Sequence, residues 1–273
     1  MDKAAKSALM VWGGWQGHEP RQCVDLFAPW LTSKGFDVTI SDTLDVYLDK
    51  ERMSRFSVVV PAWTMGQITR EQSAGLREAV RHHKDRRGRF VYVQTPGIFE
   101  ALNGAFGLEN HLAWLLLFPE ELKRVYARQA VWNRQFAMNC LDLGADMIHV
   151  SDDWGSERGL LFSPEVWWQM IYPYHKLTTD AVRARGAFAS LHCDGHFSAV
   201  VDGVIQLGYA AVHPWQESAG MSLQAFRERW MDRLAVMGGL DVQTTLGFNN
   251  RPKLKSEIER VVRLFAGGGL LFC

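Results

Sequence analysis

Short apolar stretches rich in β-branched residues alternate along the chain with longer segments in which apolar residues recur every three to four positions. The short stretches are typical of buried strands and the longer ones of amphipathic helices. Because strands and helices alternate, the pattern predicts an α/β fold of βαβ units with parallel strands and outer helices. Nine strands are predicted, at Ala8–Trp12, Asp37–Ser41, Ser57–Ala62, Phe90–Thr95, Met147–Ser151, Ala187–Leu191, Ala210–His213, Leu234–Met237 and Gly269–Phe272.

Helices are predicted between most of these strands, and their lengths divide the chain in two. The first three strands belong to compact units, whereas the last six are separated by longer segments such as Pro119–Leu143. The densest basic stretch, His82–Arg89, lies between the two groups; such a run is more often a solvated helix end than an anion-binding patch. We therefore predict two segments, residues 1–88 and 89–273. An eight-stranded (β/α) barrel needs about 250 residues, so nine strands are one too many for a single barrel.

Composition excludes several classes of protein. The 273 residues contain 30 Lys and Arg and 30 Asp and Glu, so the net charge is zero and gives no electrostatic support for binding nucleic acid or a membrane surface. The longest strongly apolar run, Leu112–Phe118, is too short to span a bilayer. The N-terminus does not have the pattern of a signal peptide. Four scattered cysteines indicate reduced thiols, and we expect a cytoplasmic protein.

Polar and aromatic side chains gather where the predicted strands end. In parallel sheets and barrels these carboxyl ends carry the functional groups. Together they predict a polar pocket with flat apolar walls, suited to a large planar ligand. The candidate residues are His18, Trp63, Asp152, Asp153, Trp154, His192, Asp194, Trp215, Gln216 and Asp241.

The acidic and histidine residues of this set have alternative roles. Asp152 and Asp153 are neighbours on one strand, so their side chains point to opposite sides; we expect one to face the pocket and the other to hold the following turn. His192 and Asp194 lie on the same side and are metal-ligand types. Two such residues are fewer than a zinc site needs, so on these grounds hydrogen bonding is favoured over metal binding. His18 follows a glycine turn, where a structural role competes with ligand binding.

From about Phe90 onward the chain contains several distinctive stretches in a fixed order. They are PGIFEALNGAFGLEN, LGADMIHVSDDWGSERGLLFSPEVWWQMIYPYHK, ASLHCDGHFSAVVDGVIQLG, HPWQ, VMGGLD and GGGLLF. In these stretches the chain resembles the uroporphyrinogen decarboxylase superfamily, including its corrinoid-linked methyltransferases. The resemblance implies a (β/α) barrel, catalytic roles for Asp152, Asp153, His192 and Asp194, and a metal held by His192 and Asp194.

The chain departs from both branches of that superfamily. The early barrel strands, which carry an arginine-rich motif in decarboxylating members, are replaced, and Asp153 stands where those members have serine. Zinc-dependent methyltransferases have a His-x-Cys-Gly motif and a later cysteine. Here His192 is kept, Asp194 takes the cysteine position, and the sequence ends at Cys273.

The first 85 or so residues contain the stretches VWGGWQGHEP, FDVTISDTLDVY and VVVPAWTMGQITREQ. In these stretches the segment resembles the N-terminal half of a ThuA-like (trehalose-utilisation) domain, which implies a flavodoxin-like sheet. The chain thus looks like a fusion of half a flavodoxin-like domain with a partial barrel. Because both families consist of parallel βα units, a three-strand piece could replace the missing start of the barrel, which would leave one strand surplus or distort the closure.

Three functions compete on these grounds. The first is corrinoid-linked methyl transfer, with zinc and a corrinoid as cofactors and a corrinoid protein as partner. The second is decarboxylation of uroporphyrinogen in porphyrin metabolism, which needs no cofactor. The third is a non-catalytic hybrid, or a module that only binds a tetrapyrrole or other small ligand. The motifs favour an enzyme of the methyltransferase branch, and the resemblance implies a homodimer.

Overall fold

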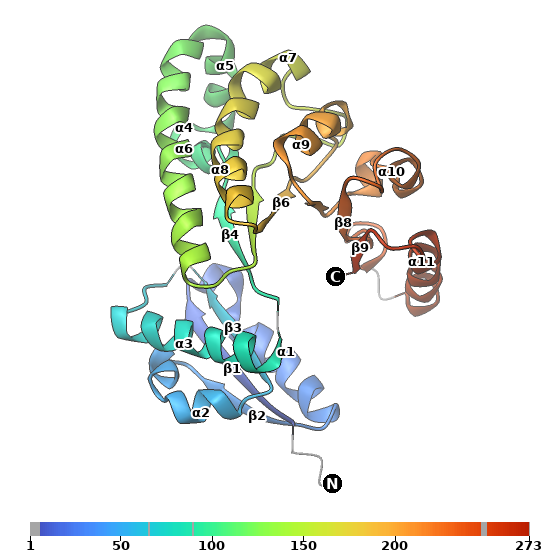
Figure 1. The fold of residues 1–273 in the computed structure, drawn as a ribbon. Helices are drawn as coiled ribbons and strands as arrows, with labels where there is room; N and C mark the ends of the chain where they lie inside the picture. Colours follow the sequence, from blue (N-terminus) through green and yellow to red (C-terminus); the bar gives the residue numbers. More distant parts are fainter. Residues whose placement is uncertain (1–5, 65, 89, 247–249, 273) are drawn as a thin grey trace. The chain divides into compact units, whose positions relative to one another are not determined.

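The computed structural model describes residues 6–64, 66–88, 90–246 and 250–272. The chain divides into two compact units, Met1–Phe90 and Val91–Cys273 (Figure 1). Each unit has its own parallel sheet, and a strand lies at each of the nine predicted places. The predicted α/β class with parallel βα units is therefore confirmed.

The N-terminal unit is a three-stranded parallel sheet in the order β2-β1-β3, covered by helices on both faces. Side chains of the central strand alternate between the faces: Leu9 and Val11 join one apolar cluster, and Ala8 and Met10 join the other. This is the order in which doubly wound sheets begin. The elements are β1 Lys6–Gly14, η1 Gln16–His18, α1 Pro20–Ser33, β2 Phe36–Ser41, η2 Leu44–Leu48, α2 Lys50–Arg55, β3 Val58–Thr64 and α3 Arg70–Arg87.

These three strands do not enter the barrel sheet, as they would if they replaced its missing start. Within the described part of the chain, they pair only with one another, and the six later strands form a second sheet. The physical reason lies in β1, which already has a parallel neighbour along each edge, with Ala8 opposite both Val38 and Val58. The N-terminal segment therefore builds its own sheet with its own two cores.

The sheet of the C-terminal unit contains six parallel strands in chain order, β4-β5-β6-β7-β8-β9. Strands that follow one another in this way, each joined to the next by helical connections, are the arrangement of a (β/α) barrel. The described sheet ends at β4 on one side and at β9 on the other. The strands are β4 Tyr92–Pro96, β5 Met147–Ser151, β6 Phe188–His192, β7 Ala211–His213, β8 Ala235–Gly238 and β9 Leu270–Phe272.

The connections contain two helices, α4 and α5, that the hydrophobic pattern did not predict. The seven residues of α4 include no buried one, and α5 exposes Leu116 and Leu117, so neither has a clear apolar stripe. The helical segments are α4 Glu100–Phe106, α5 Leu108–Leu117, α6 Pro119–Asp142, α7 Pro164–Val166, a π-helical turn Trp167–Ile171, α8 Tyr172–Ala184, η4 Ser198–Val200, α9 Val201–Leu207, η5 Glu217–Ala219, α10 Leu223–Arg229 and α11 Arg251–Leu264.

One large apolar core joins the sheet of this unit to its helices. It includes Trp154, Trp167 and Tyr126, each completely buried. Helices α6 and α8 pack side by side over it (Figure 1). Among the described helices, none is both long enough and apolar enough to cross a membrane.

Candidate functional site

Asp152, which follows β5, anchors the loop that leads into α4. It is completely buried. Its Oδ1 accepts a hydrogen bond from the backbone N–H of Glu100 (2.6 Å), and its Oδ2 accepts from those of Ile98 (3.1 Å) and Phe99 (3.2 Å). One carboxylate thus satisfies three successive amides at the start of a helix, where they lack intrahelical partners.

Two side chains complete the surroundings of Asp152. The indole Nε1–H of Trp154 (2.8 Å) and Nε2 of His175 (2.7 Å) both donate to Oδ2, and the other ring nitrogen of His175 lies 2.7 Å from the Tyr209 hydroxyl. Burial raises the pKa of Asp152, but the interactions with His175, Glu100 and Trp154 outweigh it, and the pKa lies below its ordinary value. Asp152 is therefore a charged structural centre whose partners are protein groups.

Asp153 points to the opposite side and meets His192 and Asp194. Nε2 of His192 is 3.7 Å from Oδ1 of Asp153 and 3.8 Å from Oδ2 of Asp194. All three side chains are partly exposed, and their potential ligand atoms lie within 4.8 Å of one another. Burial, together with the nearby charge of Asp194, raises the pKa of Asp153 above its ordinary value. The hydrogen bond from the backbone N–H of Asp194 lowers this pKa but does not cancel the increase. A divalent cation would relieve this repulsion, so the residues fit a metal ion.

A second group of three metal-ligand side chains shares His192. Nδ1 of His192 is 2.7 Å from Nδ1 of His213, its neighbour across β6 and β7. His149, on β5, completes the group, again with ligand atoms within 4.8 Å. Burial lowers the pKa of His213, and burial together with the other two histidines lowers the pKa of His149 to about 4. Nδ1 of His149 is already within 2.7 Å of the Ser190 hydroxyl.

Glu100 adds a third carboxyl group beside these clusters. Its backbone is held by Asp152, and its Oε2 accepts a hydrogen bond from the Ser151 hydroxyl (3.0 Å). Burial, followed by the charge of Asp153, raises the pKa of Glu100. A carboxyl group with a raised pKa, close to a candidate metal site, is suited to exchanging protons with a ligand.

Side chains at the carboxyl ends of neighbouring strands connect the loops that follow these strands. Oδ1 of Asp153 accepts from the N–H of Asp194 (2.7 Å), and Oε1 of Gln216 accepts from that of Gly195 (2.6 Å). Oδ2 of Asp241 accepts from the N–H of Ser218 (2.9 Å) in the same way. These bonds join the loops that follow β5, β6, β7 and β8. Gln216 and Asp241, both predicted to bind substrate, thus brace the loops.

The loops after β5 and β6 also touch through Gly155 and Gly195. A Cβ on Gly155 would lie 2.6 Å from the Asp194 carbonyl oxygen and 2.6 Å from the His196 nitrogen. Both are backbone atoms, which cannot rotate away. The glycine in the Asp-Asp-Trp-Gly sequence therefore allows the close approach that places Asp194 next to Asp153.

We expect Gly155→Ala to lower the free energy of unfolding by about 1–3 kcal/mol, because the added methyl group overpacks this contact. Urea denaturation of the full chain measures the effect. Gly104→Ala is the matched control, since a Cβ at Gly104 on α4 meets nothing within 4 Å. Equal stability of the two variants would contradict the close contact.

The four remaining predicted residues divide between the two units. Trp154 has no exposed surface and Trp215 is 3% exposed, so neither presents a ring face to a ligand. Trp63 belongs to β3 of the N-terminal unit, where its ring packs on Gly13. His18 ends η1 of the same unit, and its side chain lies outside the described residues.

The sequence analysis did not select three residues of the clusters: Glu100, His149 and His213. His213 ends a predicted strand and could have been chosen on that ground. His149 lies two residues before Ser151 on the same strand. Because side chains alternate along a strand, those of His149 and Ser151 point to the same side. Glu100 had no signal, because its place depends on the contact of its backbone with Asp152, 52 positions away.

Comparisons with known proteins agree with this architecture. A methyltransferase from Methanosarcina mazei has a similar fold, with a TM-score of 0.58 and 16% sequence identity over 73% of this chain. The chain spans 56% of that protein. No curated protein matches the sequence. The ThuA-like resemblance of the N-terminal segment stays a prediction. The model of the uroporphyrinogen decarboxylase (URO-D) family matches residues 98–272. The chain therefore belongs to the uroporphyrinogen decarboxylase family.

Proposed function

We propose that the C-terminal unit binds zinc through Asp153, His192 and Asp194, and promotes methyl transfer between a corrinoid and a small thiol. The observation that carries this proposal is the orientation of His192: Nε2 faces both carboxylates, while Nδ1 meets His213. Three protein ligands with a free fourth position are typical of catalytic zinc. Two carboxylates and a neutral imidazole also balance the charge of a divalent ion. The methyltransferase fold of the M. mazei protein supports the choice of reaction.

The residues around His192 fix its ring for this role. Burial lowers the pKa of His213, which favours its neutral form, and in the proposed site its Nδ1 would accept a hydrogen bond from Nδ1–H of His192, 2.7 Å away. This tautomer leaves the lone pair on Nε2 of His192 directed at the carboxylates. Bound zinc supplies Lewis acidity, which keeps a thiol deprotonated and nucleophilic at neutral pH. Glu100 would accept the proton that the thiol releases.

The corrinoid enters the proposal as the methyl donor, free or carried by a partner protein. The sequence predicted that aromatic rings, among them Trp154 and Trp215, would form flat walls for the corrinoid. Both rings are buried, so they do not support corrinoid binding. We propose a small thiol as the acceptor because the proposed zinc would stabilise its thiolate.

Zinc titration of the metal-free protein, followed by elemental analysis, tests the metal site. We expect one zinc per chain, lost in His192→Ala and weakened in Asp153→Asn and Asp194→Asn. Removing the orienting partner in His213→Ala should weaken binding by roughly 10- to 100-fold. His149→Gln is the discriminating variant and should bind zinc normally. Loss of zinc in His149→Gln, with normal binding in Asp194→Asn, would assign the metal to the three histidines instead.

The reaction is tested by mixing the zinc-loaded protein with methylcobalamin and a small thiol and following the cobalamin absorbance. We expect demethylation that requires zinc and is absent in His192→Ala. Metal-independent loss of carboxyl groups from uroporphyrinogen, with no demethylation of methylcobalamin, would contradict the proposal and favour decarboxylation.

A further inference from the structure

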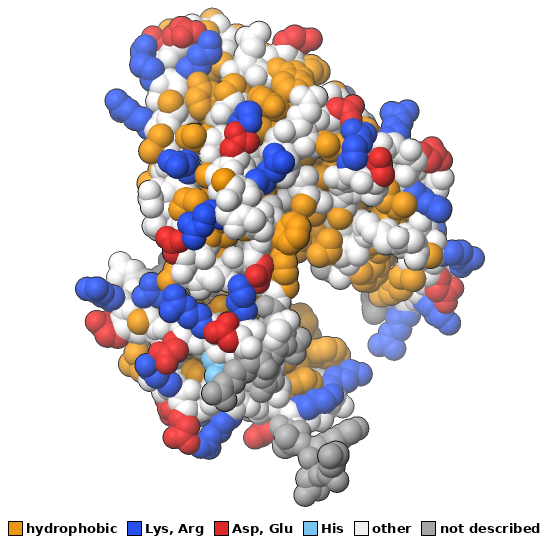
Figure 2. Space-filling model, viewed as in Figure 1, with side chains coloured by type: hydrophobic (Ala, Val, Ile, Leu, Met, Phe, Trp, Pro, Cys, Tyr) orange, Lys and Arg blue, Asp and Glu red, His pale blue; other side chains and the backbone are white. Residues whose placement is uncertain are grey.

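Basic side chains gather on the outer helices of the C-terminal unit. Figure 2 shows Lys and Arg side chains grouped on the part of the surface where Figure 1 places α11. A pocket of about 440 Å³ lies here between α10 and α11. Its lining is Gln224, Arg227, Arg260, Arg263 and Leu264, with no acidic residue among them.

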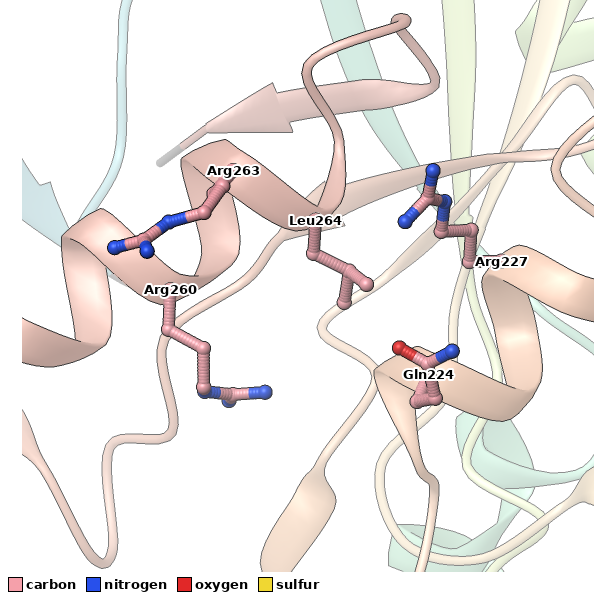
Figure 3. Close-up of a pocket in the computed structure, with 5 residues that line it drawn as sticks. All are labelled: Gln224, Arg227, Arg260, Arg263 and Leu264. Carbon is pink, nitrogen blue, oxygen red and sulfur yellow. The ribbon is translucent and has the colours of Figure 1, made fainter.

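The three arginines of the pocket differ in their partners. Arg260 is paired with Glu217, and its Nε donates to Oε2 of Glu257 (2.9 Å). Among the described side chains, no carboxylate forms an ion pair with Arg227 or Arg263. Figure 3 shows Arg260 extending from α11 toward Gln224, and Arg227 on α10 lying on the opposite side of Leu264. The side chain of Arg263 lies along α11 and points away from Arg227. The pocket therefore holds two positive charges that no protein group balances.

An anion is the ligand that this arrangement favours. Guanidinium groups present forked N–H donors that match the oxygens of phosphate, and Arg recognises phosphate with two bonds at once. The volume is within the range of small-molecule sites. Leu264 is the one apolar group in the lining, so a purely apolar ligand would leave the arginines unpaired.

We propose that the pocket between α10 and α11 binds a small phosphorylated molecule, with its phosphate held by Arg227 beside the fixed Arg260 and its remaining charge balanced by Arg263. This site goes beyond the proposed methyl transfer, since none of its lining residues belongs to the strand-end clusters. Glu217 fixes Arg260 in place, and its Oε1 also accepts from the N–H of Leu223 at the start of α10 (3.2 Å). One carboxylate thus joins both helices that form the pocket.

Calorimetric titration of the full chain with pyrophosphate tests the site. We expect saturable binding that weakens at least about tenfold in the double variant Arg227→Gln/Arg263→Gln, because each loses charge-assisted hydrogen bonds. Arg260 is left unchanged, since its loss would break the pairs with Glu217 and Glu257. Arg134→Gln on α6 is the matched control, an exposed arginine outside the pocket that should bind pyrophosphate like the wild type.

Three outcomes would overturn the proposal: no saturable binding, equal weakening by the control variant, or tighter binding of an acidic peptide than of pyrophosphate through the same arginines. The last outcome would identify the pocket as a protein-docking surface. Zinc stoichiometry, measured on the same double variant, should remain at the wild-type value. Failure of this site and failure of the proposed zinc site are therefore distinguishable.

Discussion

Replacing Asp152 with Asn is expected to lower the free energy of unfolding by about 3–5 kcal/mol, the cost of breaking a buried charged network. Asp152 is completely buried and accepts from five donors, three of them backbone amides at the start of α4. An Asn side chain has one acceptor oxygen. Whichever way its amide turns, the NH₂ group meets N–H groups that need an acceptor, and buried donors are left unpaired.

Urea denaturation of the full chain measures this loss, with Asp180→Asn as the control. Asp180 is an exposed aspartate on α8 that pairs with Lys176, and its replacement should change stability by less than about 1 kcal/mol. Hydrogen exchange adds a local readout, because the amides of Ile98, Phe99 and Glu100 should lose protection in Asp152→Asn. Unchanged protection of these amides would show that another group holds the loop.

Acid is expected to destabilise the wild-type protein by about 3 kcal/mol more than the His111→Gln variant between pH 7 and pH 4. His111 is completely buried between aromatic rings, stacked on Phe99 at 4.6 Å, and burial lowers its pKa to about 4 despite the charge of Asp152. Its Nδ1 bonds the Asn103 side chain (2.8 Å), and its Nε2 meets the Tyr126 hydroxyl.

The direction of this effect follows from proton binding. The unfolded chain protonates His111 with a pKa near 6.5, whereas the folded protein takes up that proton only near pH 4. Between these values the unfolded state binds more protons than the folded state. The contribution of His111 to the free energy of unfolding is therefore fully present above pH 6.5 and is lost as the pH drops toward 4. His149 has a similarly lowered pKa, but it is present in both proteins and cancels in the comparison.

Denaturation at a series of pH values compares the two proteins. Gln keeps hydrogen-bonding groups for Asn103 and Tyr126 but does not titrate, so its profile should be flatter. Proton NMR of the His111 ring provides a direct check on the folded wild type. A titration midpoint near 6.5 for that ring would contradict the prediction.

Local patterns in the sequence were sufficient to locate the strands. Each strand has a run of residues that fit a buried, extended backbone, and this property depends on neighbours in the chain. The same holds for helix starts: Thr69 caps α3 by accepting from the N–H of Gln72, three residues away. Helices α4 and α5 were missed because their helical state depends on distant contacts, above all the hold of Asp152 on the amide of Glu100.

The sequence by itself determined the α/β class, the two groups of strands, and the presence of acidic, histidine and aromatic residues at one edge of the second sheet. It also required Asp152 and Asp153 to face opposite sides, because strand side chains alternate. Only the tertiary structure decided their surroundings, with Asp152 among buried donors and Asp153 beside His192 and Asp194. The reason is that, apart from Trp154, these surroundings are made by residues 23 to 54 positions away, which strand pairing and helix packing bring together.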